Sequence, residues 1–106
     1  MPFTNLASAP VRPLFPGVTG RYTHAARITT GEIDLAAGAV VPVHQHPHDQ
    51  LSYVISGRLE FTVGAETHLL EPGSCTIIPG GTPHGCRALT VCRVLDTFTP
   101  IREDYR

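Results

Sequence analysis

Two blocks of sequence framed by glycines constrain this chain more than any other feature. The first runs from Gly38 to Gly57 and the second from Gly73 to His84. Glycine and proline around each block confine it to short extended runs between turns, which is typical of strands joined by tight loops. Both blocks also carry imidazole side chains, so the segments that limit the fold also limit the chemistry.

The first block contains His44, His46 and Gln50, which are separated by even numbers of residues. If this segment is extended, alternate side chains share a face, so all three would project to one side. His84 comes from the second block. Imidazoles that converge from separate β-segments suit a divalent transition metal. We therefore predict one such ion, of identity Zn, Ni, Mn, Fe or Cu, held by these four residues.

Other histidines have weaker claims on this site. His48 shares the parity of His44 and His46, so it either enters the pocket as a fifth imidazole or lines the loop. Asp49 has the opposite parity and is expected to face solvent. His24 and His68 lie in strand-like segments outside both blocks, where packing or surface roles are expected.

These residues give the chain a resemblance to the cupin superfamily. Four residues match the first motif of that family: Gly38, His44, His46 and Gly57. Gln50 stands where the family pattern has Glu. The second motif is matched through His84, with Ala88 in place of Asn. The resemblance implies an all-β, single-domain cupin barrel, a double-stranded β-helix or jelly roll, with the metal inside.

The stretch from His44 to Gly64 is similar, more narrowly, to the KdgF-type pectin-degradation cupins. Those enzymes also carry Gln among their metal ligands and end in a D-x-F-x3-R pattern, matched here by Asp96, Phe98 and Arg102. The resemblance implies the ring opening, or linearisation, of small unsaturated uronates to keto-deoxy sugars. It makes these three residues the candidate catalytic set.

The residues themselves support an anionic ligand. Gln50 is neutral, so an ion held by three imidazoles and this amide would keep its full +2 charge and attract anions. Asp96 shares parity with apolar residues of its strand, and it is either a general acid/base or the partner of an arginine. Arg102 alone would be a surface charge, but the tail that resembles the KdgF-type cupins implies that it is a carboxylate clamp, since its planar fork binds carboxylates bidentately. The chain contains no lysine, which excludes Schiff-base chemistry.

A chain of 106 residues is expected to form one domain. We predict an extended N-terminal arm over residues 1–20 and the cupin barrel over residues 21–106. Proline is frequent in the arm and periodic apolar positions are few, so the arm is either partly disordered or a strand that pairs with a partner subunit. Turn signals every eight to twelve residues in the remainder fit an all-β sandwich or barrel.

Composition limits the partners. Eight basic and nine acidic residues give a net charge of −1 without a basic run, which argues against nucleic acid and charged membranes. No apolar run is long enough to span a membrane, and the N-terminus lacks a secretory pattern. Three cysteines without a C-x-x-C pair argue against disulfides. We expect a cytoplasmic homodimer with a small anionic sugar-like substrate.

Two other classes of function remain open from the sequence. The chain could be a metal-dependent dioxygenase of a small organic substrate, or a cupin that binds an acidic sugar without turning it over. Oxygen uptake with iron bound would identify the dioxygenase, and binding without turnover would identify the non-catalytic protein.

Overall fold

The computed structural model describes residues 2–106 of the chain. Within these residues, ten strands and two single-turn 3-10 helices follow one another along the chain. Their bounds are η1 (Leu6–Ser8), β1 (Arg12–Phe15), β2 (Val18–His24), β3 (Thr29–Leu35), β4 (Val40–His44), β5 (Asp49–Ser56), β6 (Leu59–Val63), β7 (Glu66–Leu70), β8 (Cys75–Ile78), β9 (His84–Ala88), β10 (Cys92–Thr99) and η2 (Glu103–Tyr105).

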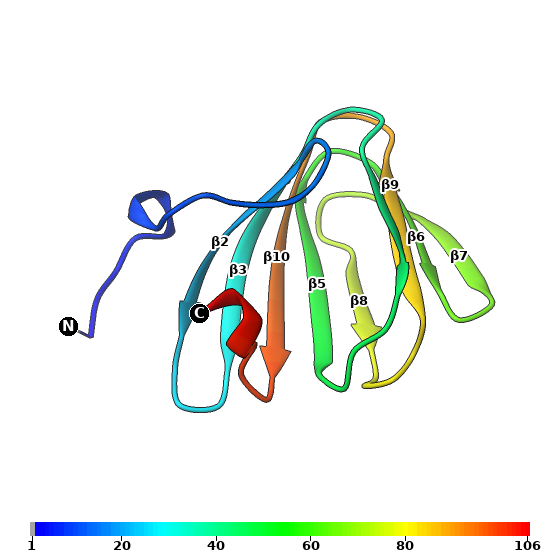
Figure 1. Ribbon diagram of the computed structural model, residues 1–106. Helices are drawn as coiled ribbons and strands as arrows, with labels where there is room; N and C mark the ends of the chain where they lie inside the picture. The colour runs from blue at the N-terminus through cyan, green and yellow to red at the C-terminus, as the bar shows by residue number, and fades with distance from the viewer. Residues whose placement is uncertain (1) are drawn as a thin grey trace.

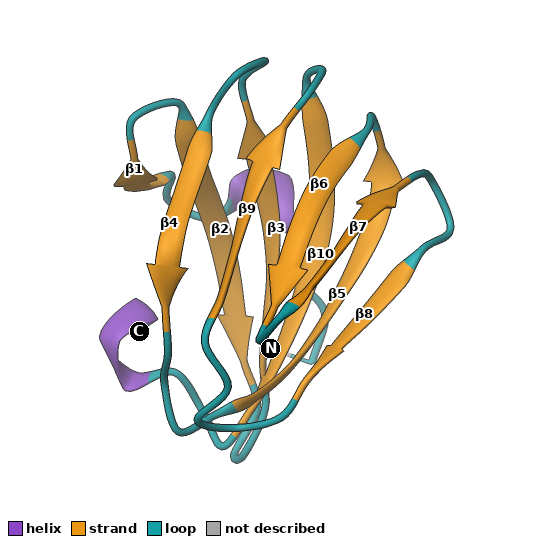
Figure 2. Cartoon of the chain, turned by 90° about the vertical axis from the view of Figure 1, so that its right-hand side faces the viewer, coloured by secondary structure: helices purple, strands orange, loops and turns teal. Residues whose placement is uncertain are grey.

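The strands form two antiparallel sheets that face each other across the core (Figure 1, Figure 2). The larger sheet has the order β1-β2-β3-β10-β5-β8, and the smaller has the order β4-β9-β6-β7. β10 lies in the middle of the larger sheet, where it pairs with β3 on one side and β5 on the other. The predicted all-β, single-domain barrel is therefore confirmed.

Alternation along the strands explains which residues enter the barrel. In β5, Gln50, Ser52 and Val54 are buried, whereas the residues between them are exposed. β3 shows the same period of two. This is the pattern of sheets with one face against a core and the other against solvent. The apolar residues buried in this core are Val18, Ile33, Leu35, Ala39, Val54, Leu59, Phe61, Ile78, Ala88, Cys92, Val94 and Phe98.

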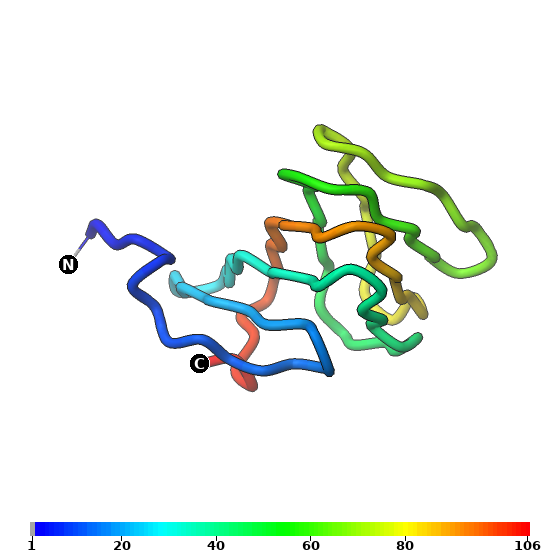
Figure 3. The backbone as a smooth tube through the Cα atoms, turned by 90° about the horizontal axis from the view of Figure 1, so that it is seen from above, coloured from blue at the N-terminus to red at the C-terminus, as the bar shows by residue number. Residues whose placement is uncertain are grey.

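The larger sheet begins at β1, which lies within the segment predicted to be an N-terminal arm. The predicted boundary at residue 20 falls inside β2, and β1 pairs with β2 of the same chain. Val18 is 1% exposed and belongs to the core, because the β2 register places it opposite Leu35. Only the segment before β1 extends away from the body, as the view from above shows (Figure 3).

The second glycine block leads into a strand. His84 follows the loop after β8 and begins β9, which pairs with both β4 and β6. The last strand, β10, begins at Cys92. No helix among residues 2–106 is long and apolar enough to cross a membrane.

Candidate metal centre and active site

Three imidazoles meet at one end of the barrel. His44 ends β4, His84 begins β9, and the register places these two residues opposite each other. His46 lies in the loop between β4 and β5. Potential ligand atoms of the three side chains all lie within 4.8 Å of one another. The three histidines could therefore bind one ion together.

Backbone carbonyls orient all three rings. Nδ1 of His44 lies 2.8 Å from the Pro42 carbonyl oxygen, and Nδ1 of His84 lies 2.8 Å from that of Thr82. Nδ1 of His46 lies 3.2 Å from the carbonyl oxygen of His48. A carbonyl oxygen only accepts, so each Nδ1 carries the proton and each Nε2 keeps a lone pair. Hydrogen bonds from Nδ1 to backbone carbonyls fix the ring orientation and leave Nε2 free to bind a metal.

Two imidazole nitrogens of the cluster lack a hydrogen-bond donor unless a cation or a proton is present. Nε2 of His84 is buried and has no hydrogen-bond partner. Nε2 of His46 lies 3.0 Å from Oε1 of Gln50, whose amide nitrogen already donates to Ser52 at 2.9 Å. Two acceptors therefore face each other, a contact that a shared cation would make favourable. The residues present fit a divalent transition metal.

The cluster forms by a different route from the one predicted. β4 ends at His44 and β5 starts at Asp49, so His44, His46 and Gln50 do not lie on one extended strand. His46 reaches the cluster from the loop, and Gln50 reaches it from the inward face of β5. Asp49 is exposed and accepts a hydrogen bond of 2.8 Å from the Gly80 amide, which ties this loop to the second glycine block.

Burial keeps the imidazoles of His46 and His84 neutral. Burial is the main cause that lowers the pKa of His46 to about 4, and the positive charge of Arg102 adds to the shift. Burial also lowers the pKa of His84. Neutral imidazole is the form that binds a metal, so ligation carries little cost in proton release near neutral pH.

A carboxylate lies next to this cluster. Asp96 of β10 accepts a hydrogen bond of 2.6 Å from Ser52, which in turn accepts from Gln50. Burial inside the barrel is the main cause that raises the pKa of Asp96 to about 6. A carboxyl group in this range can both accept and return a proton near neutral pH. None of the ion pairs among residues 2–106 includes Asp96.

Phe98 and Arg102 complete the predicted residues. Phe98 is 3% exposed, and its ring lies edge-on to His46 at 5.8 Å between centroids. Arg102 is 7% exposed, and its guanidinium carbon lies 4.7 Å from the centre of the Phe98 ring. Its Nε and Nη2 donate to Asp104 at 3.0 and 2.8 Å. Sequence reasoning did not foresee this internal carboxylate partner.

One cavity of about 60 Å³ joins these groups. Polar side chains on its wall include His44, Gln50, His84, Asp96 and Arg102, and apolar residues of both sheets form the rest. The volume holds a few waters, so a sugar ring would enter only as the side chains at the mouth move.

The comparisons with known proteins agree with this geometry. The Cupin domain family matches residues 31–98, more than half of the chain. This chain is a cupin. KdgF from Halomonas sp. is similar in structure, with a TM-score of 0.91 and 31% identity over 98% of this chain and 97% of that one.

Two further proteins resemble this cupin. An RmlC-like cupin from Shewanella frigidimarina superposes with a TM-score of 0.94 at 26% identity, covering 100% of this chain and 96% of that one. An uncharacterized protein of Streptomyces coelicolor is 31% identical over 81 residues, which cover 76% of this chain and 77% of the relative.

The structure brings four residues to the site that sequence reasoning did not name: Ser52, Tyr22, Asp104 and Tyr105. Ser52 could have been found, because it follows Gln50 by two residues on the same strand. Tyr22 and Tyr105 both line the cavity, although they lie 83 positions apart in the sequence. No local sequence pattern relates the two residues. Only the fold shows that pair.

The other histidines and Cys86 lie outside the three-histidine cluster. The ring of His48 lies 5.4 Å from that of His46, but His48 lies outside the three-histidine cluster. His24 packs the C-terminal turn against β3 through Thr29, and His68 pairs with Glu66 on the surface. Cys86 lines the cavity, and burial raises the pKa of its thiol to about 12, so it remains a protonated, apolar-like residue.

Proposed function

We propose that this cupin is a metal-dependent enzyme that opens the ring of small unsaturated uronates and yields keto-deoxy sugars. One observation supports the proposal most. Two imidazoles of the three-histidine cluster, a neutral amide, a carboxyl group and a guanidinium, from segments far apart in the chain, border the same cavity, and His46 lies beside them in the cluster. The likeness to KdgF from Halomonas sp. over almost the whole chain supports it as well.

In this proposal His44, His46, Gln50 and His84 hold the metal. The ion would supply positive charge that stabilises oxygen atoms as they become negative. Because the four ligands are neutral, that charge is not reduced by the protein, and a substrate carboxylate provides the balance. Arg102 binds the same carboxylate, and Phe98 packs against the sugar ring.

Asp96 moves the proton. Its carboxylate takes the proton of the anomeric hydroxyl, the C1–O1 bond becomes a carbonyl, and the bond between C1 and the ring oxygen breaks. The electrons of that bond leave an enolate across C4, C5 and the ring oxygen. Asp96 returns its proton to C4, and C5 becomes a ketone. The reaction is an isomerisation, so it needs no water or oxidant.

The test follows the loss of ultraviolet absorbance of an unsaturated uronate against its spontaneous rate. Protein loaded separately with Zn, Ni, Mn or Fe should accelerate the loss, and Asp96→Asn should abolish the acceleration while it keeps fold and metal. Arg102→Lys should mainly raise KM, because a point charge replaces a bidentate fork. Absence of acceleration with all four metals would refute the proposal.

The other two hypotheses predict different outcomes in the same experiment. A dioxygenase loaded with iron would consume oxygen. Without oxygen it would leave the uronate unchanged. A non-catalytic cupin would bind the acidic sugar at a measurable affinity and show no turnover with any of the metals.

A further inference from the structure

Arg102 is held more firmly than a carboxylate clamp alone requires. Two of its nitrogens donate to Asp104, and its guanidinium carbon lies 4.1 Å from the centre of the Tyr105 ring as well as 4.7 Å from that of Phe98. The side chain is only 8% exposed. One carboxylate and two aromatic rings therefore fix both the position and the tilt of the guanidinium.

The remaining donors of Arg102 are directed away from Asp104. A guanidinium has five N–H groups, of which Asp104 takes one on Nε and one on Nη2. None of the hydrogen bonds with good geometry among residues 2–106 uses Nη1, although the Tyr105 side chain lies near the guanidinium, and Nη1 is not among their fully buried polar atoms without a partner. Nη1 and the second hydrogen of Nη2 form an end-on fork, the geometry that suits another carboxylate.

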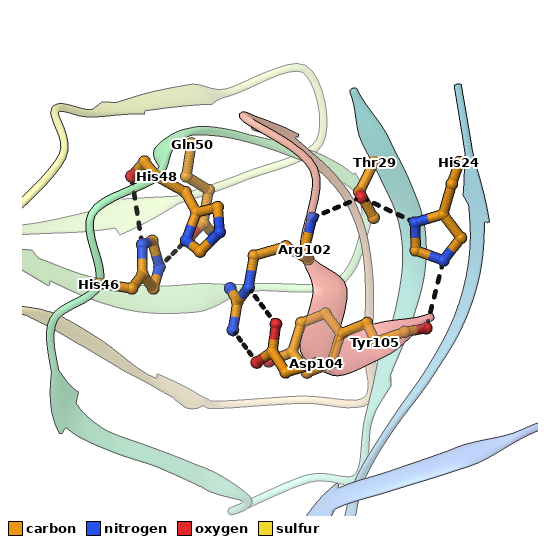
Figure 4. A network of polar contacts seen from close by, with 8 residues as sticks. All are labelled: His24, Thr29, His46, His48, Gln50, Arg102, Asp104 and Tyr105. Atoms are coloured by element: carbon orange, nitrogen blue, oxygen red, sulfur yellow. Dashed lines mark hydrogen bonds and ion pairs between the residues drawn. The ribbon is translucent and has the colours of Figure 1, made fainter. Parts of the chain in front are cut away.

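That free fork belongs to the cavity of the metal site. Arg102 lines this cavity, and its charge is close enough to lower the pKa of both His46 and His84. Figure 4 shows its side chain directed from the C-terminal turn towards the side of His46 and Gln50, with Asp104 on the other side of the guanidinium. An anion between Arg102 and the imidazoles would meet the positive charge of Arg102 on one side and that of a bound metal ion on the other.

We propose that Asp104 is a positioning residue that holds Arg102 with its end-on fork towards the cavity, so that a sugar carboxylate can bind there. This inference rests on the proposed function, in which Arg102 binds the substrate carboxylate. It goes beyond that function because it assigns a role to a residue that does not touch the ligand.

The turn that carries Asp104 is itself anchored. The backbone N–H of Arg102 donates to Thr29 at 2.9 Å, and His24 bridges Thr29 and the carbonyl oxygen of Tyr105 at 2.8 and 3.2 Å (Figure 4). The hydrogen bonds from Arg102 also lower the pKa of Asp104, which keeps its carboxylate charged. A fixed, charged partner is what the orientation of a buried guanidinium requires.

Two effects of Asp104 on an anionic ligand have opposite signs. Its negative charge alone repels the ligand, so loss of that charge would tighten binding by Coulomb's law. Its hydrogen bonds orient the fork, so their loss would weaken binding. If Asp104 merely competed for Arg102 with the ligand, its removal would also tighten binding. The direction of the change therefore decides the role.

The experiment measures binding of D-galacturonate, a saturated uronate that cannot undergo the reaction, to zinc-loaded protein by calorimetry. Asp104→Asn should weaken binding by roughly tenfold, with unchanged zinc content. The matched control is Glu103→Gln, which makes the same charge change on the same turn, where the carboxylate pairs with Arg106 instead. It should change binding by less than about twofold.

Galactose, which lacks the carboxylate, serves as the second probe and should bind equally to Asp104→Asn and wild type. If Asp104→Asn does not fold, Asp104→Glu keeps the charge but moves the carboxylate, and it should weaken galacturonate binding by a smaller factor. Unchanged or tighter galacturonate binding in the Asp104 variant would overturn the inference, as would a wild type that does not bind galacturonate.

The two proposals fail separately. If wild type binds galacturonate but does not accelerate loss of the unsaturated uronate, the proposed reaction is wrong, and the comparison of Asp104→Asn with Glu103→Gln still decides the positioning role. If turnover is present, Asp104→Asn should raise KM with kcat within about twofold, since the metal ligands and Asp96 are untouched.

Discussion

Gln50 determines the charge of the metal site at the scale of a single residue. Its side chain is 7% exposed, its Oε1 lies 3.0 Å from Nε2 of His46, and its amide nitrogen donates to Ser52, which donates to Asp96. Gln50→Glu should keep the metal, because a carboxylate is also a ligand, but it should weaken galacturonate binding. The added negative charge repels the anion by up to a few kcal/mol in a dry pocket. Calorimetry on zinc-loaded protein measures the change, and galactose binding is the control. Equal galacturonate affinity would show that site charge does not select the ligand.

Asp96 makes a second prediction at this scale, for metal-free protein. Burial raises its pKa from 3.8 to about 6, so its proton stabilises the folded state at low pH, and this contribution is lost as pH rises through 6. His46 and His84 have lowered pKa values and oppose this trend, because they lose stability as pH falls below 6.5. Wild type and Asp96→Asn contain the same histidines. The difference between their free energies of unfolding therefore removes the histidine contribution to the pH dependence.

The free energy of unfolding of wild type minus that of Asp96→Asn should therefore fall between pH 4 and pH 6.5, by an amount on the order of 2 kcal/mol. Chemical denaturation in the presence of a chelator, at several pH values, measures it. A difference that stays constant with pH would show that the carboxyl group has an ordinary pKa in the folded protein.

At the scale of elements, β2, β3 and the C-terminal turn form a stack under Arg102. The Tyr22 ring covers Gly31, where an added Cβ would lie 2.3 Å from a ring carbon, and Tyr105 stacks on Tyr22 with ring centres 4.4 Å apart. Arg102 lies over Tyr105. Gly31 of β3 leaves room for the Tyr22 ring. The position of the Arg102 guanidinium therefore depends on Gly31 through Tyr22 and Tyr105.

Gly31→Ala should displace Tyr22 and destabilise the protein by about 1–3 kcal/mol, as overpacking does. The double variant Gly31→Ala with Tyr22→Ala removes the clash, so the alanine at position 31 should cost much less in that background. Urea unfolding of the four proteins gives the coupling energy. If the cost of Gly31→Ala is the same with and without the Tyr22 ring, the two residues do not interact as described.

The sequence predicted the site residues that lie in the two glycine blocks. It did not predict those that reach the site only through the tertiary structure. The two glycine blocks predicted that His44, His46 and His84 would come together, although the extended strand that the spacing suggested is broken by a loop after His44. Asp104 and Tyr22 carry no spacing signal that relates them to Arg102. Their contacts depend on how the C-terminal turn folds back over β2 and β3, which is a property of the tertiary structure.

For the whole molecule, metal binding should contribute to stability. An ion that binds the folded chain and not the unfolded chain adds about 4 kcal/mol when its concentration is a thousandfold above Kd. Removal of metal with a chelator should therefore lower the melting temperature of wild type. His46→Ala should melt close to chelated wild type, with little further response to chelator. Equal metal content in wild type and His46→Ala would contradict the assignment of His46 as a metal ligand.

The predicted homodimer remains a proposal, and the outer face of the larger sheet is where we expect it. Leu51 and Ile77 are 46% and 72% exposed and pair across β5 and β8, next to Tyr53 at 44%. Exposed apolar patches of this kind mark association surfaces. Light scattering should give a dimer mass for wild type and a monomer mass for Leu51→Arg with Ile77→Arg. A monomeric wild type would disprove the dimer.

The barrel itself could be predicted from the glycine and proline punctuation, because such turns leave room only for short strands. The boundary at residue 20 could not be placed correctly. Val18 reads as one apolar residue in a proline-rich segment, and its place in the core follows only from its register with Leu35. Pairing between distant strands is decided by packing, and local sequence carries little information about it.

The central place of β10 in the larger sheet has a consequence for biosynthesis. β3 and β5 each need β10 as a neighbour, yet β10 is made after every other strand. While the ribosome is still producing residues 92–99, the edges of β3 and β5 that β10 will cover stay unpaired, and unpaired edges are prone to aggregate. The sheet can therefore close, and Asp96 can join the histidines, only once translation has passed this strand.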